Sequence, residues 1–500
     1  MSTGANSILG IQTTGGAAQT AASTHSEPAA GDGVHSGAGG LDGTVQVDLS
    51  GFAAKTWVPH DYQQRAVEWL VTRPEGALFL PPGMGKTSCS LEAFITLRKM
   101  GYAKKMLILA PKKVCEATWP AEISKWFQFQ GLTVGFAHGE DRVHVLKAKL
   151  DIVLLNYDGL AWAHQHIKPG MFDILLCDEI TKLKNHKSKR FEYIKPLLPH
   201  FRFRWGLTGS PAANGLIDLF GQVYILDQGR RLGRYITHYR MKYFHQKPND
   251  DYGWYITPEK SKMLIERLED MAMYLDPKEW LNLPELLTIP RPVYLDKADQ
   301  NKYEELEDQF IIKMEEAGYV TAANAGVLTS KLRQFTGGGI YQDSETWHRV
   351  HDKKLDALED LVDELAGAPL MVAYQFEHEL IRLKERFPKA LVLKGGMNSF
   401  VVKGTVDMWN SGAHEILLVQ PSSAAHGLNL QFGGAAICWF TLTYNYEEYS
   451  QLIARIYRQG QTQRVFNYIL AADKTIDARV ARVLSAKDVV QEDLFKALKR

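Results

Sequence analysis

Residues 80–87 combine glycines, a lysine and a threonine in a spacing suited to holding the phosphates of a nucleotide. An apolar run precedes this segment, and helical spacing follows it. Glycines let successive backbone N–H groups face a phosphate, and the start of the next helix adds a favourable dipole. We expect Lys86 to reach the β- and γ-phosphates and the Thr87 hydroxyl to ligate Mg²⁺. The other residues expected to touch the cofactor here are Pro82, Gly83, Met84, Gly85 and Ser88. The alternative is a surface turn with a solvated lysine.

Two adjacent acids, Asp178 and Glu179, end another apolar run at 174–177. Ionised carboxylates at the end of a buried strand are costly unless they are paired or bound to a metal. With a phosphate loop upstream, we expect Asp178 to hold Mg²⁺, directly or through water, and Glu179 to orient or deprotonate an attacking water. The alternative, a strand that simply meets a polar loop, would be preferred if the pair stood alone.

Strands that are buried on both faces must position these groups. Uninterrupted apolar runs at 77–80, 106–110, 152–155 and 174–177 alternate with helical segments, which predicts a parallel sheet covered on both sides. The pattern returns near the end of the chain, with strand candidates at 370–374, 390–393, 416–419, 436–440 and 464–470. The predicted fold class is therefore α/β with two lobes, each a mostly parallel sheet flanked by helices.

The predicted division of the chain has four parts. Residues 1–48 form a disordered tail rich in Gly, Ala and Ser, residues 49–245 the first lobe, residues 246–340 a helical insertion or linker, and residues 341–500 the second lobe. Residues 1–50 contain no Lys, Arg, Phe, Trp or Tyr, so they have little to bury. A plain linker is the favoured interpretation of the tail, and a binding role is the alternative.

Composition excludes several classes of protein. Hydrophobic residues make up 45% and charged residues 23% of the 500, which excludes collagen-like, wholly disordered and disulfide-scaffold chains. The net charge is +1 overall and +5 over residues 51–500, where all 58 bases face 53 acids. The four cysteines form no CxxC pair, and we expect them to be reduced and mostly buried. No secretory signal and no membrane span are expected.

Eight ordered segments between about residues 55 and 480 resemble one family. Besides the two already described, they include Tyr62-Gln63, Ala110-Pro111 with Trp119, Asn156-Tyr157, residues 207–214 (LTGSPAAN), residues 427–430 (GLNL) and residues 451–461 (QLIARIYRQGQ). In this order they resemble the superfamily-two helicase-like ATPases, in particular the Swi/Snf-related double-stranded-DNA translocases. The segment at 451–461 is the most discriminating match. The resemblance implies two RecA-like lobes, with ATP and Mg²⁺ as cofactors.

The resemblance assigns nucleotide contacts outside the phosphate loop to Tyr62, Gln63, Gly427 and Gln451, and catalytic roles to Arg455 and Arg458. The two arginines are three residues apart, on one face of a helix, and arginine donates bidentately to phosphate oxygens. As arginine fingers they would act only when the lobes close, and such fingers contribute about 10³–10⁵ in rate in other nucleotide hydrolases. For an isolated pair, a solvated helix would be the default interpretation.

Two positions depart from the family pattern. Leu80 stands where the strict phosphate-loop pattern has Gly, although the Gly-x-Gly-Lys-Thr core is intact. Thr181 stands where the family's second motif usually has His, the residue thought to couple the ATP site to the DNA motifs. The coupling between the two is therefore expected to differ in detail here.

Contacts to nucleic acid are expected on the phosphate backbone and to be largely independent of base sequence. The candidates, chosen by their position in the motifs, are Lys112, Lys113, Lys182, Lys184, Asn185, Lys187, Thr208, Ser210, Ser422 and Ser423. A second candidate segment, 230–244, interleaves bases with aromatics. Aromatics at helical spacing more often belong to a core, which is the alternative for that segment.

The sequence thus predicts an ATP-dependent translocase or remodeller of double-stranded or branched DNA, of fork or repair type or from a bacterium or phage. A strand-separating helicase, the motor of a restriction system, and an ATP-gated DNA-binding protein without hydrolysis are the alternatives. We expect a monomeric motor in a cytoplasm or nucleus, without membrane attachment. The intact Glu179, Arg455 and Arg458 weigh against the binder without hydrolysis.

Overall fold

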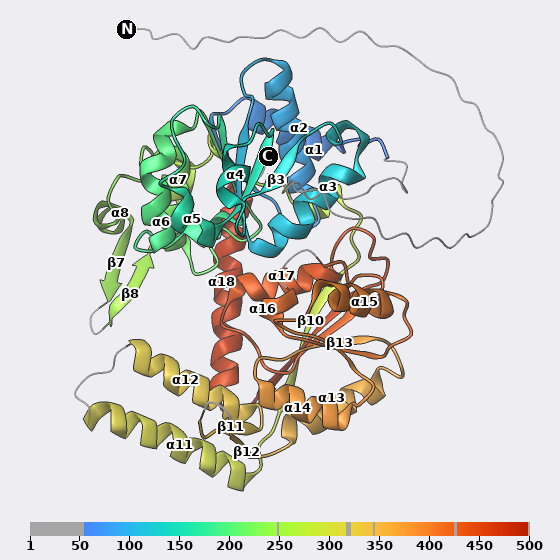
Figure 1. The fold of residues 1–500 in the computed structure, drawn as a ribbon. Helices are drawn as coiled ribbons and strands as arrows, with labels where there is room; N and C mark the ends of the chain where they lie inside the picture. The colour runs from blue at the N-terminus through green and yellow to red at the C-terminus, as the bar shows by residue number, and fades with distance from the viewer. Residues whose placement is uncertain (1–54, 248–249, 317–321, 344–345, 425–427, 499–500) are drawn as a thin grey trace, which may run out of the picture. The chain divides into compact units, whose positions relative to one another are not determined.

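The computed structural model describes residues 55–247, 250–316, 322–343, 346–424 and 428–498. The predicted tail at 1–48 lies outside these ranges. The described elements are organised around two parallel sheets, each with helices on both faces (Figure 1). This is the predicted α/β fold class with two lobes.

The first sheet has seven strands in the order β3-β4-β2-β5-β6-β1-β9, and all its neighbouring strands are parallel. The strands are β1 (Glu75–Phe79), β2 (Met106–Ala110), β3 (Val134–Phe136), β4 (Ile152–Asn156), β5 (Ile174–Asp178), β6 (Phe203–Thr208) and β9 (Ala272–Met273). Four of them, β2, β4, β5 and β6, are buried along their whole length, as expected for the mostly apolar strands of a sheet covered on both faces. Their carboxyl ends meet at one edge, which collects the polar residues that follow them.

Two groups of helices cover the first sheet. One face carries α1 (Asp61–Val71), α2 (Lys86–Lys99), α3 (Trp119–Lys125) and α10 (Pro277–Trp280). The other face carries α4 (Arg142–Lys147), α5 (Leu160–Ala163), α6 (Lys189–Ile194), α7 (Leu219–Asp227), α8 (Ile236–Tyr243) and α9 (Pro258–Glu266). An antiparallel hairpin, β7 (Phe244–Lys247) and β8 (Asp250–Ile256), joins α8 to α9.

The second sheet has six parallel strands in the order β10-β17-β16-β13-β15-β14. They are β10 (Leu286–Val293), β13 (Leu370–Ala373), β14 (Leu391–Leu393), β15 (Ile416–Val419), β16 (Ala436–Trp439) and β17 (Val465–Ala472). One face packs against α13 (Lys353–Glu364) and α14 (Glu377–Arg386). The other packs against α12 (Ala322–Thr336), α15 (Ser399–Asn410) and α17 (Tyr446–Ile456). The remaining elements are α11 (Lys297–Glu316), the hairpin β11 (Gly339–Tyr341) and β12 (Trp347–Arg349), and α16 (Pro421–Ala424).

The last helix, α18 (Ile476–Leu498), belongs to both halves of the fold. Its first part places Ile476, Val480 and Leu484 in the core of the second sheet, whereas Leu494 and Leu498 lie in the core of the first. In Figure 1 it is the red helix that runs from one group of elements to the other. One continuous helix therefore ties the two sheets together through apolar burial.

The expected boundaries at 246–340 and 341–500 need correction. Two strands of the supposed helical insertion belong to the sheets, because β9 pairs with β1 and β10 pairs with β17 along its whole length. Backbone hydrogen bonding thus brings the chain into the second sheet before residue 341. The end of the chain also departs from the expected division, since α18 finishes in the core of the first sheet.

Two expectations about the chain as a whole concern thiols and membranes. Cys89, Cys115, Cys177 and Cys438 are all buried and free of disulfide bonds, as predicted. Within the described ranges, no helix combines the length and apolar character that crossing a membrane requires.

Two helical glycines give a matched test of the packing behind the site. A Cβ on Gly221 in α7 would lie closer than 3.0 Å to the carbonyl oxygens of Leu183 and Lys184, whereas one on Gly404 in α15 would meet nothing within 4 Å. We expect Gly221→Ala to lower the free energy of unfolding by about 1–3 kcal/mol through overpacking. Gly404→Ala should raise it by about 0.5–1 kcal/mol, because alanine favours helix. Denaturant unfolding of both variants measures this, and equal effects would contradict the close approach at Gly221.

Candidate active site

The loop between β1 and α2 turns on two glycines with left-handed backbone. Gly83 has φ 90° and Gly85 has φ 77°, conformations that cost an L side chain about 1–2 kcal/mol. A Cβ on Gly85 would also collide with the Nε2 atom of Gln63. The backbone conformation therefore favours glycine at position 85, and a larger residue there would displace the Gln63 side chain from the loop. Leu80, the departure from the strict pattern, is fully buried at the start of this loop.

The loop closes around its own lysine. Lys86 begins α2, and its Nζ donates to the carbonyl oxygens of Leu80 at 2.7 Å and of Pro81 at 3.4 Å. Burial lowers the pKa of Lys86, and the charges of Glu179 and Asp178 oppose that shift. The ammonium group is thus held at the carboxyl end of β1, beside the two acids.

The other expected nucleotide contacts lie around this loop. Gln63 is 7% exposed, and its Nε2 donates to the carbonyl of Met84 at 3.4 Å, so α1 touches the loop directly. Tyr62 is 1% exposed and packs near Trp280, and burial raises its pKa to about 12. The Ser88 hydroxyl donates to the Glu122 carboxylate, so this hydroxyl is engaged by another side chain of the protein.

Asp178 ends β5 and is only 8% exposed. Its Oδ2 accepts a hydrogen bond from the indole Nε1 of Trp119 at 3.0 Å, and the Tyr157 hydroxyl donates to its backbone carbonyl at 2.8 Å. Burial raises the pKa of Asp178, while Lys86 and the indole donor oppose this. Trp119 therefore holds the carboxylate of Asp178, and Tyr157 holds its backbone carbonyl; the resemblance pointed to both residues.

Glu179 stands in a strained conformation. Its φ is 55°, in the left-handed region that non-glycine residues seldom occupy and that often marks functional sites. Its Oε2 accepts from the Thr208 hydroxyl at 3.4 Å. Burial is the main cause of the raised pKa of Glu179. The charge of Lys86 opposes this shift, whereas the charge of Glu447 raises the pKa further. The strain turns this carboxylate out of the strand at the edge where the charged groups meet.

Two arginines reach the same place from the second sheet. Arg455 lies in the last turn of α17 and Arg458 just after it, and both donate to the carbonyl of Leu428 at 3.4 Å. A Cβ on Gly83 would lie 3.5 Å from the Cβ of Arg458 and 3.8 Å from its Nη2, so Arg458 packs over the phosphate loop. Burial and the neighbouring Arg458 lower the pKa of Arg455 to about 10, and Glu179 opposes that shift.

A glutamate on α17 bonds to the turn that follows Glu179. The Oε1 of Glu447 accepts from the Thr181 hydroxyl at 3.3 Å and from Gln451 Nε2 at 3.4 Å, and it lies 3.7 Å from Lys182 Nζ. Thr181 is the residue that replaces the family's histidine. The hydrogen bond between Thr181 and Glu447 thus connects the edge of the first sheet to α17, the helix that carries Arg455.

A second polar contact runs beside the first. The backbone N–H of Ser210 donates to the Thr208 hydroxyl at 3.1 Å, and the Ser210 and Ser450 hydroxyls lie 3.0 Å apart. Thr208 in turn donates to Glu179. A chain of hydroxyl contacts therefore leads from Glu179 through β6 to α17. The expectation that Thr208 and Ser210 face a nucleic acid is not met in this structure, because they are 0% and 5% exposed and bond to protein.

The lysines expected to contact nucleic acid differ in their surroundings. Lys184 is paired with Asp218 at 3.0 Å, Lys182 with Glu447, and Lys112 with Glu116 at 3.7 Å. Lys113 and Lys187 are exposed, and the Asn185 side chain accepts from the backbone of Lys187. Ser422 is exposed and Ser423 bonds to Gln420 at 3.2 Å. Gly427 lies outside the described residues.

Much of the second candidate segment, 230–244, is engaged in contacts within the protein. Tyr239, Tyr243 and Phe244 are at most 5% exposed and lie in the core of the first sheet. Arg231 is paired with Asp270 at 2.7 Å and with Asp227 at 3.3 Å. The core interpretation of its aromatics is the one that the structure supports.

Sequence reasoning missed the part played by Glu447. Glu447 lies four residues before Gln451, so both side chains lie on one face of a helix. That face also carries apolar residues, and an acid among them was the available signal. No pattern could show that this face meets Thr181, because 266 residues separate the two in the chain.

The arrangement suits a triphosphate and its metal. Two left-handed glycines shape the loop, and three cations converge on it beside two carboxylates. No set of three or more His, Cys, Asp or Glu side chains in the described ranges is placed to hold a metal alone. Mg²⁺ commonly uses one or two protein ligands together with phosphate oxygens. Asp178 and Thr87 are the residues that would hold it here.

Comparisons with known proteins show what this chain is similar to. Residues 62–336 match the family described as the SNF2-related domain. Protein p41 of Acyrthosiphon pisum secondary endosymbiont phage 1 is 31% identical over 465 residues, which cover 89% of this chain and all of that protein. The uncharacterized ATP-dependent helicase YqhH of Bacillus subtilis is 22% identical, over 86% of this chain and 78% of the helicase.

Among solved structures, the SWI2/SNF2 ATPase core of Sulfolobus solfataricus in complex with double-stranded DNA is 19% identical. The match has a TM-score of 0.43 and covers 88% of this chain and 94% of that one.

Gly85→Ala tests the shape of the loop. It should weaken binding of a fluorescent ATP analogue by about tenfold or more, since about 1.4 kcal/mol already gives that factor. Gly101→Ala is the matched control, because Gly101 has φ 76° but no atom within 4 Å of the added Cβ. Both variants carry the same backbone strain, and only Gly85→Ala collides with Gln63. Equal binding by the two variants would show that the loop does not shape the nucleotide site.

Proposed function

Because the chain belongs to the SNF2-related domain family, we propose that it hydrolyses ATP and uses the energy to move along double-stranded DNA. The observation that carries this proposal is the meeting of Lys86 and Glu179 from the first sheet with Arg455 and Arg458 from the second. A site assembled from two halves can change its activity when the halves move.

In this proposal the loop at 80–87 and Lys86 bind the phosphates, while Gln63 holds the loop from α1. Mg²⁺, held by Asp178 and Thr87, would neutralise charge on the phosphates. Glu179 orients the attacking water and accepts its proton. Arg455 and Arg458 stabilise the negative charge that develops on the γ-phosphate. Each of these roles depends on the closed arrangement, in which Arg458 packs over Gly83.

Motion would follow from closure. The contacts between Thr181 and Glu447 and between Ser210 and Ser450 lie at the same boundary as the arginines. Opening after phosphate release would break them together, and closure on the next ATP would remake them. Exposed basic side chains such as Lys113 and Lys187 would hold the DNA backbone through this cycle.

Two other functions fit the same site. A strand-separating helicase would use the same chemistry, and the similarity to YqhH, an uncharacterized ATP-dependent helicase, makes it the second candidate. A DNA-binding protein gated by ATP without hydrolysis would not need Glu179 and the two arginines. A role in DNA repair or at a fork, and a preference for branched DNA, remain predictions from the sequence.

Hydrolysis of ATP without nucleic acid, with single-stranded DNA and with duplex DNA tests the motor. We expect strong stimulation by the duplex, lost in Lys86→Ala and Glu179→Gln, and a fall of about 10³-fold or more in Arg458→Ala. Displacement of a triplex-forming strand without separation of the duplex would identify a translocase, and separation a helicase. ATP binding without hydrolysis under every condition would rule out the motor.

A double-mutant cycle tests the coupling of the two halves. Thr181→Val and Glu447→Ala should each lower the duplex-stimulated kcat, and their combined effect should be smaller than the sum, with an interaction energy of about 0.5–3 kcal/mol. The KM for ATP should change little, because neither side chain bonds to the phosphate loop. Thr181→Ser, which retains the hydroxyl, should keep the rate. Additive effects would show that this hydrogen bond does not couple the halves.

A further inference from the structure

The helix α3 contacts both elements that carry the expected metal ligands. Asp178 ends β5, and Thr87 lies in the first turn of α2. On α3, the indole of Trp119 donates to the Asp178 carboxylate at 3.0 Å. The Glu122 carboxylate, also on α3, accepts from the hydroxyl of Ser88, which follows Thr87 directly. One short helix therefore bonds to one ligand and to the immediate neighbour of the other.

The two side chains that make these bonds come from one side of α3. Trp119 and Glu122 are three residues apart in a helix, a spacing that places side chains next to each other. The indole of Trp126 donates to the Glu122 carboxylate at 2.7 Å, at the same oxygen that accepts from Ser88. Two donors thus hold the Glu122 side chain, and the helix backbone sets its distance from Trp119.

A wide helical turn places the Trp119 side chain. Residues Val114–Thr118 form a π-helix, and the backbone N–H of Trp119 donates to the carbonyl of Val114, five residues earlier. Such turns are rare and frequently occur at functional sites. A turn closed over five residues rotates the side chains that follow it about the helix axis. The turn therefore determines the direction in which the indole leaves α3, toward the end of β5.

The indole is a rigid donor to a group that could otherwise rotate. Trp119 is fully buried and packs in the core between the first sheet and the helices α1 and α2. The Tyr157 hydroxyl fixes the backbone carbonyl of Asp178, so the freedom that remains to this residue is rotation of its carboxylate. That terminal torsion has a broad energy minimum. A charge-assisted hydrogen bond from a fixed N–H selects one orientation of the carboxylate.

We propose that Trp119 and Glu122 position the residues that bind the Mg²⁺ of the nucleotide. Trp119 orients the Asp178 carboxylate, and Glu122 holds the start of α2, where Thr87 lies. The inference rests on the proposed function, because it concerns the metal that accompanies ATP. Side chains that orient the direct ligands of a metal typically change its affinity by about 10–100-fold. Loss of the indole N–H should therefore weaken nucleotide binding only when the metal is present, since Lys86 and the phosphate loop are unchanged.

The test is Trp119→Phe in the full chain, which retains an aromatic ring and removes the N–H donor. Binding of a fluorescent, non-hydrolysable ATP analogue is measured with Mg²⁺ and with EDTA, and the ratio of the two affinities gives the effect of the metal. We expect this ratio to fall by about tenfold, with the affinity in EDTA unchanged. An unchanged ratio would overturn the proposal. So would equal weakening with and without Mg²⁺, which is the result of a general loss of structure.

Trp205→Phe is the matched control. Trp205 is also fully buried in the same core, and its indole donates to the backbone carbonyl of Arg73 at 3.3 Å. Both variants lose one buried indole donor and leave the same space, but only Trp119→Phe takes a donor from a carboxylate. The control should keep the metal ratio of the unsubstituted chain. An equal fall in the two variants would assign the effect to core packing and overturn the proposal.

A second variant tests the other contact of α3 without enlarging the core. Glu122 is half-buried, and Glu122→Ala removes the acceptor of the Ser88 hydroxyl. We expect it to lower the metal ratio as well, whereas Glu122→Gln, which retains a carbonyl oxygen, should keep the ratio. An unchanged ratio in Glu122→Ala, or an equal fall in Glu122→Gln, would overturn the role of Glu122.

Failure of this inference and failure of the proposed function are distinguishable. Duplex-stimulated hydrolysis by the unsubstituted chain judges the motor, whereas the metal ratio judges the positioning residues. If the unsubstituted chain hydrolyses ATP on duplex DNA and Trp119→Phe keeps the metal ratio, the inference fails and the proposed function stands. Nucleotide binding that does not respond to Mg²⁺ in the unsubstituted chain would also overturn the inference, and the hydrolysis assay would still judge the motor.

Discussion

Burial of opposite charges at the edge of one sheet is the constraint on which the rest of this structure depends. Asp178 is buried and Lys86 and Glu179 are half-buried, and burial alone would shift the pKa of each so as to favour its neutral form. Lys86 opposes the shift of each carboxylate, and both carboxylates oppose the shift of Lys86, whereas the charge of Asp178 raises the pKa of Glu179 further. Removing one member leaves an uncompensated charge in a low-dielectric site, which is more costly than never having buried the group.

The second half of the fold completes that balance. Arg455 lies on α17 and Arg458 just after it, and the charge of Glu179 favours the charged form of Arg455. The same helix places Glu447 on Thr181 and Ser450 on Ser210. The chemistry of the site and the contact between the two halves are thus carried by one helix. A movement that separates the halves must break the charge balance and the hydrogen bonds together.

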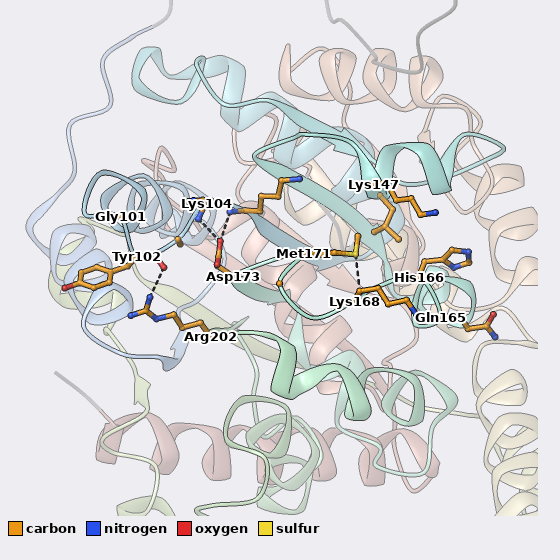
Figure 2. A pocket seen from close by; sticks show the side chains of 14 residues that line it. Gly101, Tyr102, Lys104, Lys147, Gln165, His166, Lys168, Met171, Asp173 and Arg202 are labelled. Carbon is orange, nitrogen blue, oxygen red and sulfur yellow. Dashed lines mark hydrogen bonds between the residues drawn. The ribbon is translucent and has the colours of Figure 1, made fainter.

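A parallel sheet offers two different edges, and this chain uses them differently. At the carboxyl edge of the first sheet, acids and bases are mixed and mostly paired. At the amino edge, five cationic side chains line a pocket together with a single carboxylate that is already bonded to backbone N–H groups (Figure 2). The five residues of β5, all buried, separate the two edges by about 16 Å.

The sequence by itself determined the strands, the loop and the residues at the active edge. Uninterrupted apolar runs allow only buried parallel strands, and Gly-x-Gly-Lys-Thr between a strand and a helix has few other uses. Only the tertiary structure decided what depends on contacts distant in the chain. Such contacts include Glu447 with Thr181, the burial of Thr208 and Ser210, the pairing of β10 with β17, and the docking of α18 in both cores. Local patterns specify which face of an element is apolar, but they do not specify which distant element covers it.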